Sequence, residues 1–144
     1  MAIKGTEDEN PNIVNMSIRE FDITDEFTAL PKATTSSDLA KRLLEVPRGA
    51  IFLMDDNGTP VGAVTAREFL ITIAKGVEVL GMTAEDLMNT NIMEIGNDDN
   101  VSEVLDKISK FIPYAVVVKD DEGKFVGYFS PKDYHEALQK IGVL

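Results

Sequence analysis

Two short stretches of the chain each combine a hydroxyl, a cation and a carboxylate. Thr65–Glu68 reads Thr-Ala-Arg-Glu, and Ser130–Asp133 reads Ser-Pro-Lys-Asp. If each stretch opens a helix, the unpaired amides and the helix dipole favour an anion such as phosphate, to which the hydroxyl and the cation can also donate. The carboxylate can accept hydrogen bonds from two vicinal hydroxyls, as on a ribose. Together these side chains suit a nucleotide.

The same spacing has a purely structural interpretation. A Ser or Thr followed three residues later by Glu or Asp is the pattern of a capping box. Glu68 would then satisfy the backbone N–H of Thr65, and Asp133 that of Ser130. The spacing alone leaves both interpretations open.

Both stretches occupy the same place in an internal repeat. Residues 50–62 are matched by residues 115–127, which lie 65 positions later, and the match continues through Phe69 against Tyr134. One copy is too short to bury a generous core alone, so we expect the two to pack across a pseudo-two-fold axis. A cleft along such an axis could hold a ligand between the halves.

Each copy reads as strand, helix, strand, strand, helix, which predicts an α+β fold of two pseudo-symmetric β-α-β-β-α repeats packed sheet to sheet. In the second copy we expect a strand at 91–95, a helix from Asn100 to about Ile112, and hairpin strands at 115–118 and 125–129. Ser130 should cap the last helix, with proline at the first helical position.

The first copy follows the same plan. Ser36 or Ser37 is expected to cap a helix through Leu44, the hairpin strands are expected at 50–54 and 61–65, and the last helix should end near Gly76. The acidic turns of both hairpins are expected to be solvated turn formers rather than cation sites. We divide the chain into a tail with a short docking element (1–21), a first repeat (22–82) and a second repeat (83–144). Apolar residues between 13 and 21 suggest that the docking element packs on the first copy.

Composition excludes several classes of protein. The 144 residues include 14 basic and 25 acidic ones, and the net charge of -11 opposes binding to nucleic acid or to anionic membranes. The chain has no cysteine and a single histidine, His135, so it lacks the residues for a thiolate zinc site, a cysteine nucleophile or a multi-histidine metal centre. It shows no signal peptide or membrane span. We therefore expect a cytoplasmic protein with no catalytic residues, no metal and no resident cofactor.

The repeat of roughly sixty residues, the Asp86-Leu87-Met88 leader, the hairpin strands around an acidic-Gly turn and the Gly-x-x-Ser/Thr-x-x-Asp corner resemble a pair of cystathionine β-synthase (CBS) domains, a Bateman module. The resemblance covers about residues 22–142. It implies a cleft between the two sheets that binds adenosyl compounds such as AMP, ADP, ATP or S-adenosylmethionine. It also implies composite sites, in which the corner of one copy works with the first strand and pre-hairpin loop of the other.

The resemblance carries over to two sets of residues. One site would consist of Tyr128, Ser130, Lys132 and Asp133 with Thr28, Arg48 and Gly49, where Asp133 holds the ribose and Ser130, Lys132 and Arg48 hold phosphate. The other would consist of Ala63, Thr65, Arg67 and Glu68 with Asn91, Met93, Pro113 and Tyr114. Glu68 replaces the family's Asp and moves the carboxylate out by about 1.5 Å, roughly one C–C bond. We therefore rank the Asp133 site first.

These observations favour a stand-alone regulatory module that senses an adenine nucleotide, forms a homodimer and acts on a partner protein. Two alternatives stay open. One is a ligandless pair that only dimerises or scaffolds, and the other is a sensor of S-adenosylmethionine. An enzyme is disfavoured, because the sequence shows no nucleophile paired with a base and no glycine-rich phosphate loop.

Overall fold

The computed structural model describes residues 16–24, 27–46 and 50–142. It has a mixed α+β fold with two three-stranded sheets, which confirms the predicted fold class. The chain divides into two compact units. The first repeat unit is Thr24–Met93, and the second repeat unit combines the residues up to Ile23 with those from Glu94 onward.

The first repeat unit contains the predicted strand, helix, strand, strand, helix order. Its parallel pair β1–β2 continues into the antiparallel hairpin β2–β3, and the apolar strand faces pack against α3 and the short α5. The elements are β1 (Phe27–Pro31), α3 (Ser36–Glu45), β2 (Ala50–Met54), β3 (Pro60–Val64), α4 (Ala66–Ala74) and α5 (Ala84–Leu87). The core consists of Leu39, Ile51, Leu53, Val64, Ala84 and Leu87.

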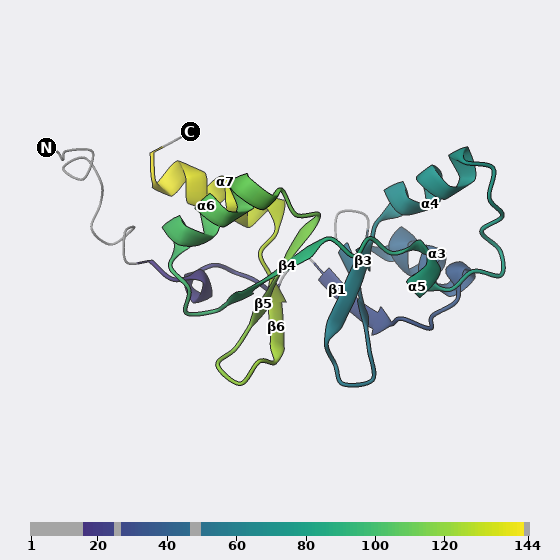
Figure 1. Ribbon diagram of the computed structural model, residues 1–144, viewed down its shortest axis with the longest axis horizontal. Coiled ribbons are helices and arrows are strands. Elements are labelled where there is room, and N and C mark those ends of the chain that lie inside the picture. The colour runs from purple at the N-terminus through teal and green to yellow at the C-terminus, as the bar shows by residue number, and fades with distance from the viewer. Residues whose placement is uncertain (1–15, 25–26, 47–49, 143–144) are drawn as a thin grey trace, which may run out of the picture. The chain divides into compact units, whose positions relative to one another are not determined.

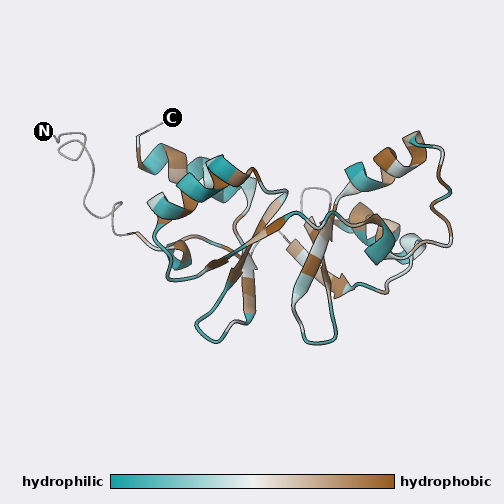
Figure 2. Ribbon diagram, in the orientation of Figure 1, coloured by the Kyte–Doolittle hydropathy of each residue, from teal (hydrophilic) through white to brown (hydrophobic). Residues whose placement is uncertain are grey.

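The second repeat unit repeats this plan. In Figure 1, α6 and α7 lie on one side of the β4–β5–β6 sheet, and the β5–β6 turn projects away from them. Figure 2 shows the apolar strands, and helices that are polar on part of their surface. The elements are the 3₁₀ helix η1 (Ile18–Glu20), β4 (Ile92–Gly96), α6 (Val101–Phe111), β5 (Ala115–Lys119), β6 (Phe125–Tyr128) and α7 (Pro131–Lys140).

One predicted helix cap is wrong by a residue. Helix α3 is capped by Thr35, whose hydroxyl accepts the amide of Asp38 at 3.2 Å. Ser36 is buried, and its hydroxyl donates to the carbonyl of Val79 at 2.8 Å. A tertiary hydrogen bond therefore takes the side chain that local sequence favoured as the cap.

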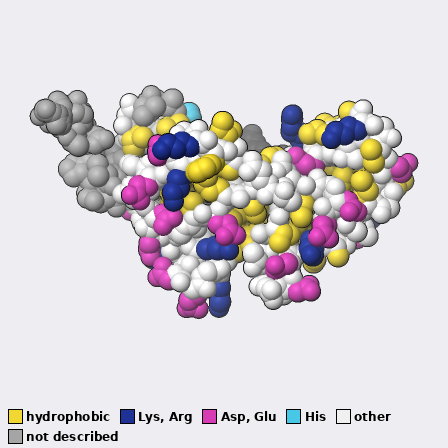
Figure 3. Space-filling model, in the orientation of Figure 1, with side chains coloured by type: hydrophobic (Ala, Val, Ile, Leu, Met, Phe, Trp, Pro, Cys, Tyr) yellow, Lys and Arg dark blue, Asp and Glu magenta, His cyan; other side chains and the backbone are white. Residues whose placement is uncertain are grey.

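The two hairpin turns are built by aspartate side chains. Asp55 Oδ1 accepts two turn amides at 2.9 Å each, and Asp120 Oδ1 does the same in the second hairpin. The turn glycines Gly58 and Gly123 have positive φ angles, as this geometry requires. The prediction that Asp55 and Asp120 form turns is confirmed, and acidic side chains gather over both turns in Figure 3.

The docking element before the first repeat packs on the second repeat unit, so the prediction that it docks on the first copy is wrong. The amides of Ile18 and Arg19 donate to the carbonyls of Asp99 and Asn97, and the amide of Val101 donates to the carbonyl of Met16. Ile18 is fully buried there. Backbone hydrogen bonds and burial, rather than proximity in sequence, decide where the element docks. We call residues 16–23 the N-terminal strap.

Among the described residues, no helix is both long and apolar enough to cross a membrane.

Candidate functional site

The corner at Ser130 is a closed capping box. Asp133 Oδ2 accepts both the amide and the hydroxyl of Ser130, each at 3.0 Å, and the amide of Asp133 donates back to Ser130 Oγ at 3.2 Å. Pro131 occupies the first helical turn, as predicted. Ser130 is 1% exposed and Asp133 is 2% exposed. The sequence pattern therefore satisfies the orphan donors at the start of α7.

The corner at Thr65 makes the same arrangement with a longer acid. Glu68 Oε1 accepts the amide of Thr65 at 2.7 Å and its hydroxyl at 3.0 Å. Glu68 is 8% exposed, so this carboxylate is also buried. The longer side chain of Glu68 therefore still brings its carboxylate to the amide and hydroxyl of Thr65.

Capping does not by itself exclude a ligand role for these carboxylates. An ionised carboxylate has about four acceptor positions, of which Ser130 occupies two at Asp133. The box also fixes the rotamer of the carboxylate, so little further ordering is required on binding.

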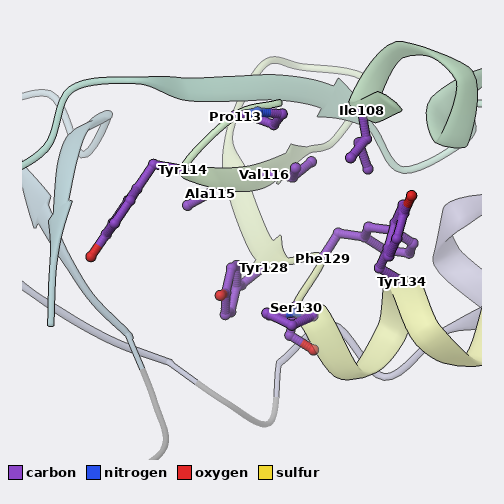
Figure 4. Close-up of a pocket in the computed structure, with 10 residues that line it drawn as sticks. Ile108, Pro113, Tyr114, Ala115, Val116, Tyr128, Phe129, Ser130 and Tyr134 are labelled. Atoms are coloured by element: carbon purple, nitrogen blue, oxygen red, sulfur yellow. The ribbon is translucent and has the colours of Figure 1, made fainter. Parts of the chain in front are cut away.

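A pocket of about 180 Å³ lies beside this corner, within the second repeat unit. In Figure 4, Pro113 and Val116 lie along one side, Tyr128 and Ser130 lie opposite, and Tyr134 closes one end beside Phe129. The lining residues are Ile108, Pro113, Tyr114, Ala115, Val116, Tyr128, Phe129, Ser130, Pro131 and Tyr134.

The chemistry of this pocket is aromatic and uncharged. All three tyrosines of the chain line it, and none of its lining residues is ionic at neutral pH. Flat aromatic rings bind other π systems by offset stacking or edge contacts, and tyrosine hydroxyls can supply hydrogen bonds at the rim. The walls therefore suit a planar, weakly polar group, with the start of α7 at one side.

The structure brings together residues that the sequence assigned to two different sites. Tyr128 and Ser130 were predicted for the first site, Pro113 and Tyr114 for the second, and all four line this one pocket. Lys132 is exposed and is not among the lining residues.

One described residue predicted for the first site, Thr28, belongs to the first repeat unit. Thr28 is half-buried in β1 of the first repeat unit, where it pairs with Ile51 of β2. Arg48 and Gly49 lie outside the described residues.

The other predicted site falls mostly in the first repeat unit. Ala63 exchanges two backbone hydrogen bonds with Asn89, at 3.0 and 2.9 Å, and the amide of Asn91 donates to Asn89 Oδ1. Arg67 is exposed at the start of α4, and Met93 is half-buried at the end of the unit.

Sequence reasoning missed six lining residues. They are Ile108, Ala115, Val116, Phe129, Pro131 and Tyr134. The spacing of Ser130 and Tyr134 contained a usable signal, because residues four apart share one face of a helix. The apolar residues gave none, since a buried wall residue and a core residue look alike in sequence.

Comparison with known proteins identifies the repeat. The CBS domain family model matches residues 18–75 and 84–140. An uncharacterized protein of Methanopyrus kandleri is 24% identical over 124 residues, which is 83% of this chain and 61% of that protein. The chain thus spans less than two thirds of that relative.

Several solved structures share the fold. An uncharacterized conserved protein from Pyrococcus horikoshii has a TM-score of 0.70 at 22% identity, covering 86% of this chain and 92% of that one. The CBS domain pair of protein MJ0100, in complex with 5′-methylthioadenosine and S-adenosyl-L-methionine, has a TM-score of 0.69 at 21% identity, with coverage of 86% and 96%. A CBS domain protein from Pyrobaculum aerophilum complexed with AMP has a TM-score of 0.64 at 21% identity, with coverage of 86% and 99%. With both repeats matched by the family model and the fold shared with CBS pairs, this chain belongs to the CBS domain family and carries two CBS domains.

Proposed function

We propose that this protein is a regulatory module that binds an adenosyl nucleotide, and that the aromatic pocket of the second repeat unit receives the base. The single observation that carries the proposal is the placement of an uncharged pocket with three tyrosines directly beside the N-terminus of α7. A purine fits the aromatic walls, and a helix N-terminus favours the phosphate of the same molecule. The complexes of similar CBS pairs with AMP, 5′-methylthioadenosine and S-adenosyl-L-methionine support this class of ligand.

AMP, ADP or ATP is the proposed effector, in preference to S-adenosylmethionine. Lys132 lies two residues beyond Ser130, at the start of α7, where its cation can act on a phosphate group outside the apolar pocket. The ribose would be held by Asp133, next to Ser130. Thr28, Arg48 and Gly49 remain proposed contributors from the first repeat, and Thr65, Arg67 and Glu68 mark the proposed second site. We further propose that the module acts as a homodimer in the cytoplasm on a partner protein, without catalysis.

A ligandless scaffold is the second candidate, and one observation favours it. Asp133 and Glu68 are each buried and each hold the hydroxyl and amide of their own cap residue. Such corners are complete as structural caps. In that case the aromatic pocket would serve only in packing.

Calorimetry distinguishes the nucleotide-binding module from the ligandless scaffold. The compounds to titrate are AMP, ADP, ATP, 5′-methylthioadenosine and S-adenosylmethionine. Binding should weaken in Tyr134→Ala, which removes one wall of the pocket, and should persist in Phe111→Ala. Phe111 is 68% exposed in the same unit and does not line the pocket. A thermal shift provides a second readout, because a ligand at 100 times its Kd stabilises the fold by about 2.7 kcal/mol. Absence of binding and of any shift with all five compounds would establish the scaffold instead.

A further inference from the structure

The N-terminal strap lies directly behind the aromatic pocket. The ring of Phe21 packs edge-on against Phe129, with centroids 5.6 Å apart and an interplanar angle of 85°. The carbonyl of Ile23 accepts the amide of Tyr128 at 2.7 Å. Both Phe129 and Tyr128 line the pocket. A segment that precedes the first repeat therefore supports two walls of the second repeat's pocket.

The fit at Gly127 shows how close the strap approaches β6. A Cβ atom at this position would meet the carbonyl oxygen of Ile23 at 2.5 Å and the Ile23 side chain at 2.6 Å. Real Cβ contacts of this length essentially never occur, and one of the opposing atoms belongs to the backbone. A glycine at position 127 is thus a requirement of strap docking.

The other end of the strap is anchored by residues that do not line the pocket. The amide of Arg19 donates to the carbonyl of Asn97 at 2.9 Å, and the amide of Val101 donates to the carbonyl of Met16 at 2.9 Å. Arg19 also pairs with Asp98. These contacts report whether the strap is docked without themselves touching a ligand in the pocket.

We propose that the N-terminal strap is a positioning element of the ligand pocket, and that strap docking and ligand binding stabilise each other. This proposal rests on the proposed function and adds a route by which binding is signalled. If the docked strap holds Phe129 and Tyr128 in the geometry that a base requires, linkage demands that the bound base favours the docked strap by the same factor. The chain passes from Ile23 directly to Thr24, the first residue of the other repeat unit, so the strap is covalently joined to that unit.

The first repeat offers a matched control at the equivalent glycine. A Cβ at Gly62 would meet Met88 Sδ at 2.5 Å and the carbonyl oxygen of Asn89 at 3.1 Å. Gly62→Ala therefore introduces the same methyl group in the first repeat unit, where its shortest contacts are to the Met88 side chain. Neither Gly62 nor Gly127 has a positive φ, so in both variants the effect is steric rather than conformational.

The test measures amide hydrogen exchange at Arg19 and Val101 together with AMP affinity by calorimetry. In the wild-type protein, saturating AMP should slow exchange at both amides. Gly127→Ala should speed their exchange and weaken AMP binding by about 10-fold, within the range of ordinary coupling between sites. Gly62→Ala should leave exchange at Arg19 and Val101 unchanged.

A second series of variants tests the proposal without the steric clash of Gly127→Ala. Phe21→Ala removes the edge contact with Phe129 without adding atoms, and Phe21→Leu restores most of the apolar contact. AMP affinity should fall in the order wild type, Phe21→Leu, Phe21→Ala. Equal affinity across this order would overturn the proposal.

The outcomes separate this proposal from the one on which it rests. If the wild type binds AMP but Gly127→Ala, with fast exchange at Arg19 and Val101, binds it equally well, the strap is only a structural appendage and the proposed function stands. Unchanged exchange at both amides on saturation with AMP leads to the same conclusion. If the wild type binds none of the five adenosyl compounds, the proposed function and this inference fail together.

Discussion

Ser130 and Asp133 form a reciprocal pair, in which one carboxylate oxygen accepts two hydrogen bonds from Ser130 and the Asp133 amide returns one to Ser130 Oγ. Both residues are buried. The pair therefore stabilises α7 and also fixes the group proposed to hold a ribose. The two roles can be separated because Thr65 and Glu68 form the same box and neither of them lines the aromatic pocket.

Asp133→Ala and Glu68→Ala should cost similar stability but differ in ligand affinity. Each leaves an N-cap amide and hydroxyl without their acceptor, buried at Ser130 and part-buried at Thr65, which should lower the free energy of unfolding by about 1 to 3 kcal/mol. Asp133→Ala should also weaken AMP binding by about 1.5 to 3 kcal/mol, or about 10- to 150-fold. Urea titration and calorimetry on both variants give the two quantities. Equal AMP affinity for wild type and folded Asp133→Ala would reduce Asp133 to a helix cap.

Nucleotide affinity should depend on ionic strength and on Lys132. Lys132 is exposed at the start of α7 in a chain of net charge -11, so its attraction for phosphate acts over a Debye length of about 8 Å at physiological salt. AMP binding should weaken as salt rises and weaken further in Lys132→Ala, whereas Lys140→Ala, at the other end of the same helix, should have little effect. Tighter binding of S-adenosylmethionine than of any adenine nucleotide, indifferent to Lys132→Ala, would exclude the phosphate assignment.

Two copies should associate through the first repeat. A groove of about 320 Å³ lies between α3 and α4, and its walls include Leu44, which is 84% exposed, and Leu70, which is 65% exposed. The equivalent positions of the second repeat are Ser109 and His135, so the fold itself does not require leucine there. Replacing Leu44 by Ser and Leu70 by His should weaken the dimer by at least about 100-fold, since four leucine side chains per dimer lose their buried surface.

Sedimentation at tens of micromolar measures the loss of dimer affinity. Phe111→Ser is the control, because it replaces an exposed apolar residue of the second repeat. The chain has no cysteine, so Leu44→Cys should form a disulfide with its own copy under mild oxidation, and Ser109→Cys should not. A monomeric wild type would contradict the dimer. If Phe111→Ser dissociates the dimer instead, the dimer contact lies in the second repeat.

Ile112→Gly should stabilise the protein. Ile112 ends α6 with φ 45° and ψ 61°, a left-handed conformation that costs a β-branched residue about 1 to 2 kcal/mol. Its side chain is largely exposed, so little packing is lost on removal. The net gain should be about 0.5 to 1 kcal/mol after the added backbone entropy of glycine in the unfolded chain. Phe111→Gly, one residue earlier and still helical, should instead destabilise, and thermal unfolding of both variants distinguishes these effects.

The sequence by itself determined the repeat, the order of its elements and the capping boxes. These features depend on residues within four positions of one another, or on the identity of the repeated pattern. Ser130 and Asp133 meet because they are three apart at a helix start, and Asp120 builds its turn from amides two and four residues on. Local chemistry was sufficient in each case.

Only the tertiary structure decided where the strap docks and which side chains share a pocket. Arg19 and Val101 are tied down by backbone carbonyls distant in sequence, and a backbone hydrogen bond leaves no mark in the identity of either residue. Tyr114, Tyr128 and Tyr134 come from a loop, a strand and a helix, and they line one pocket only because β5 pairs with β6 and α7 packs against that sheet. Such contacts join segments that are far apart in the sequence. Local residue types and their spacing do not specify which distant segments meet.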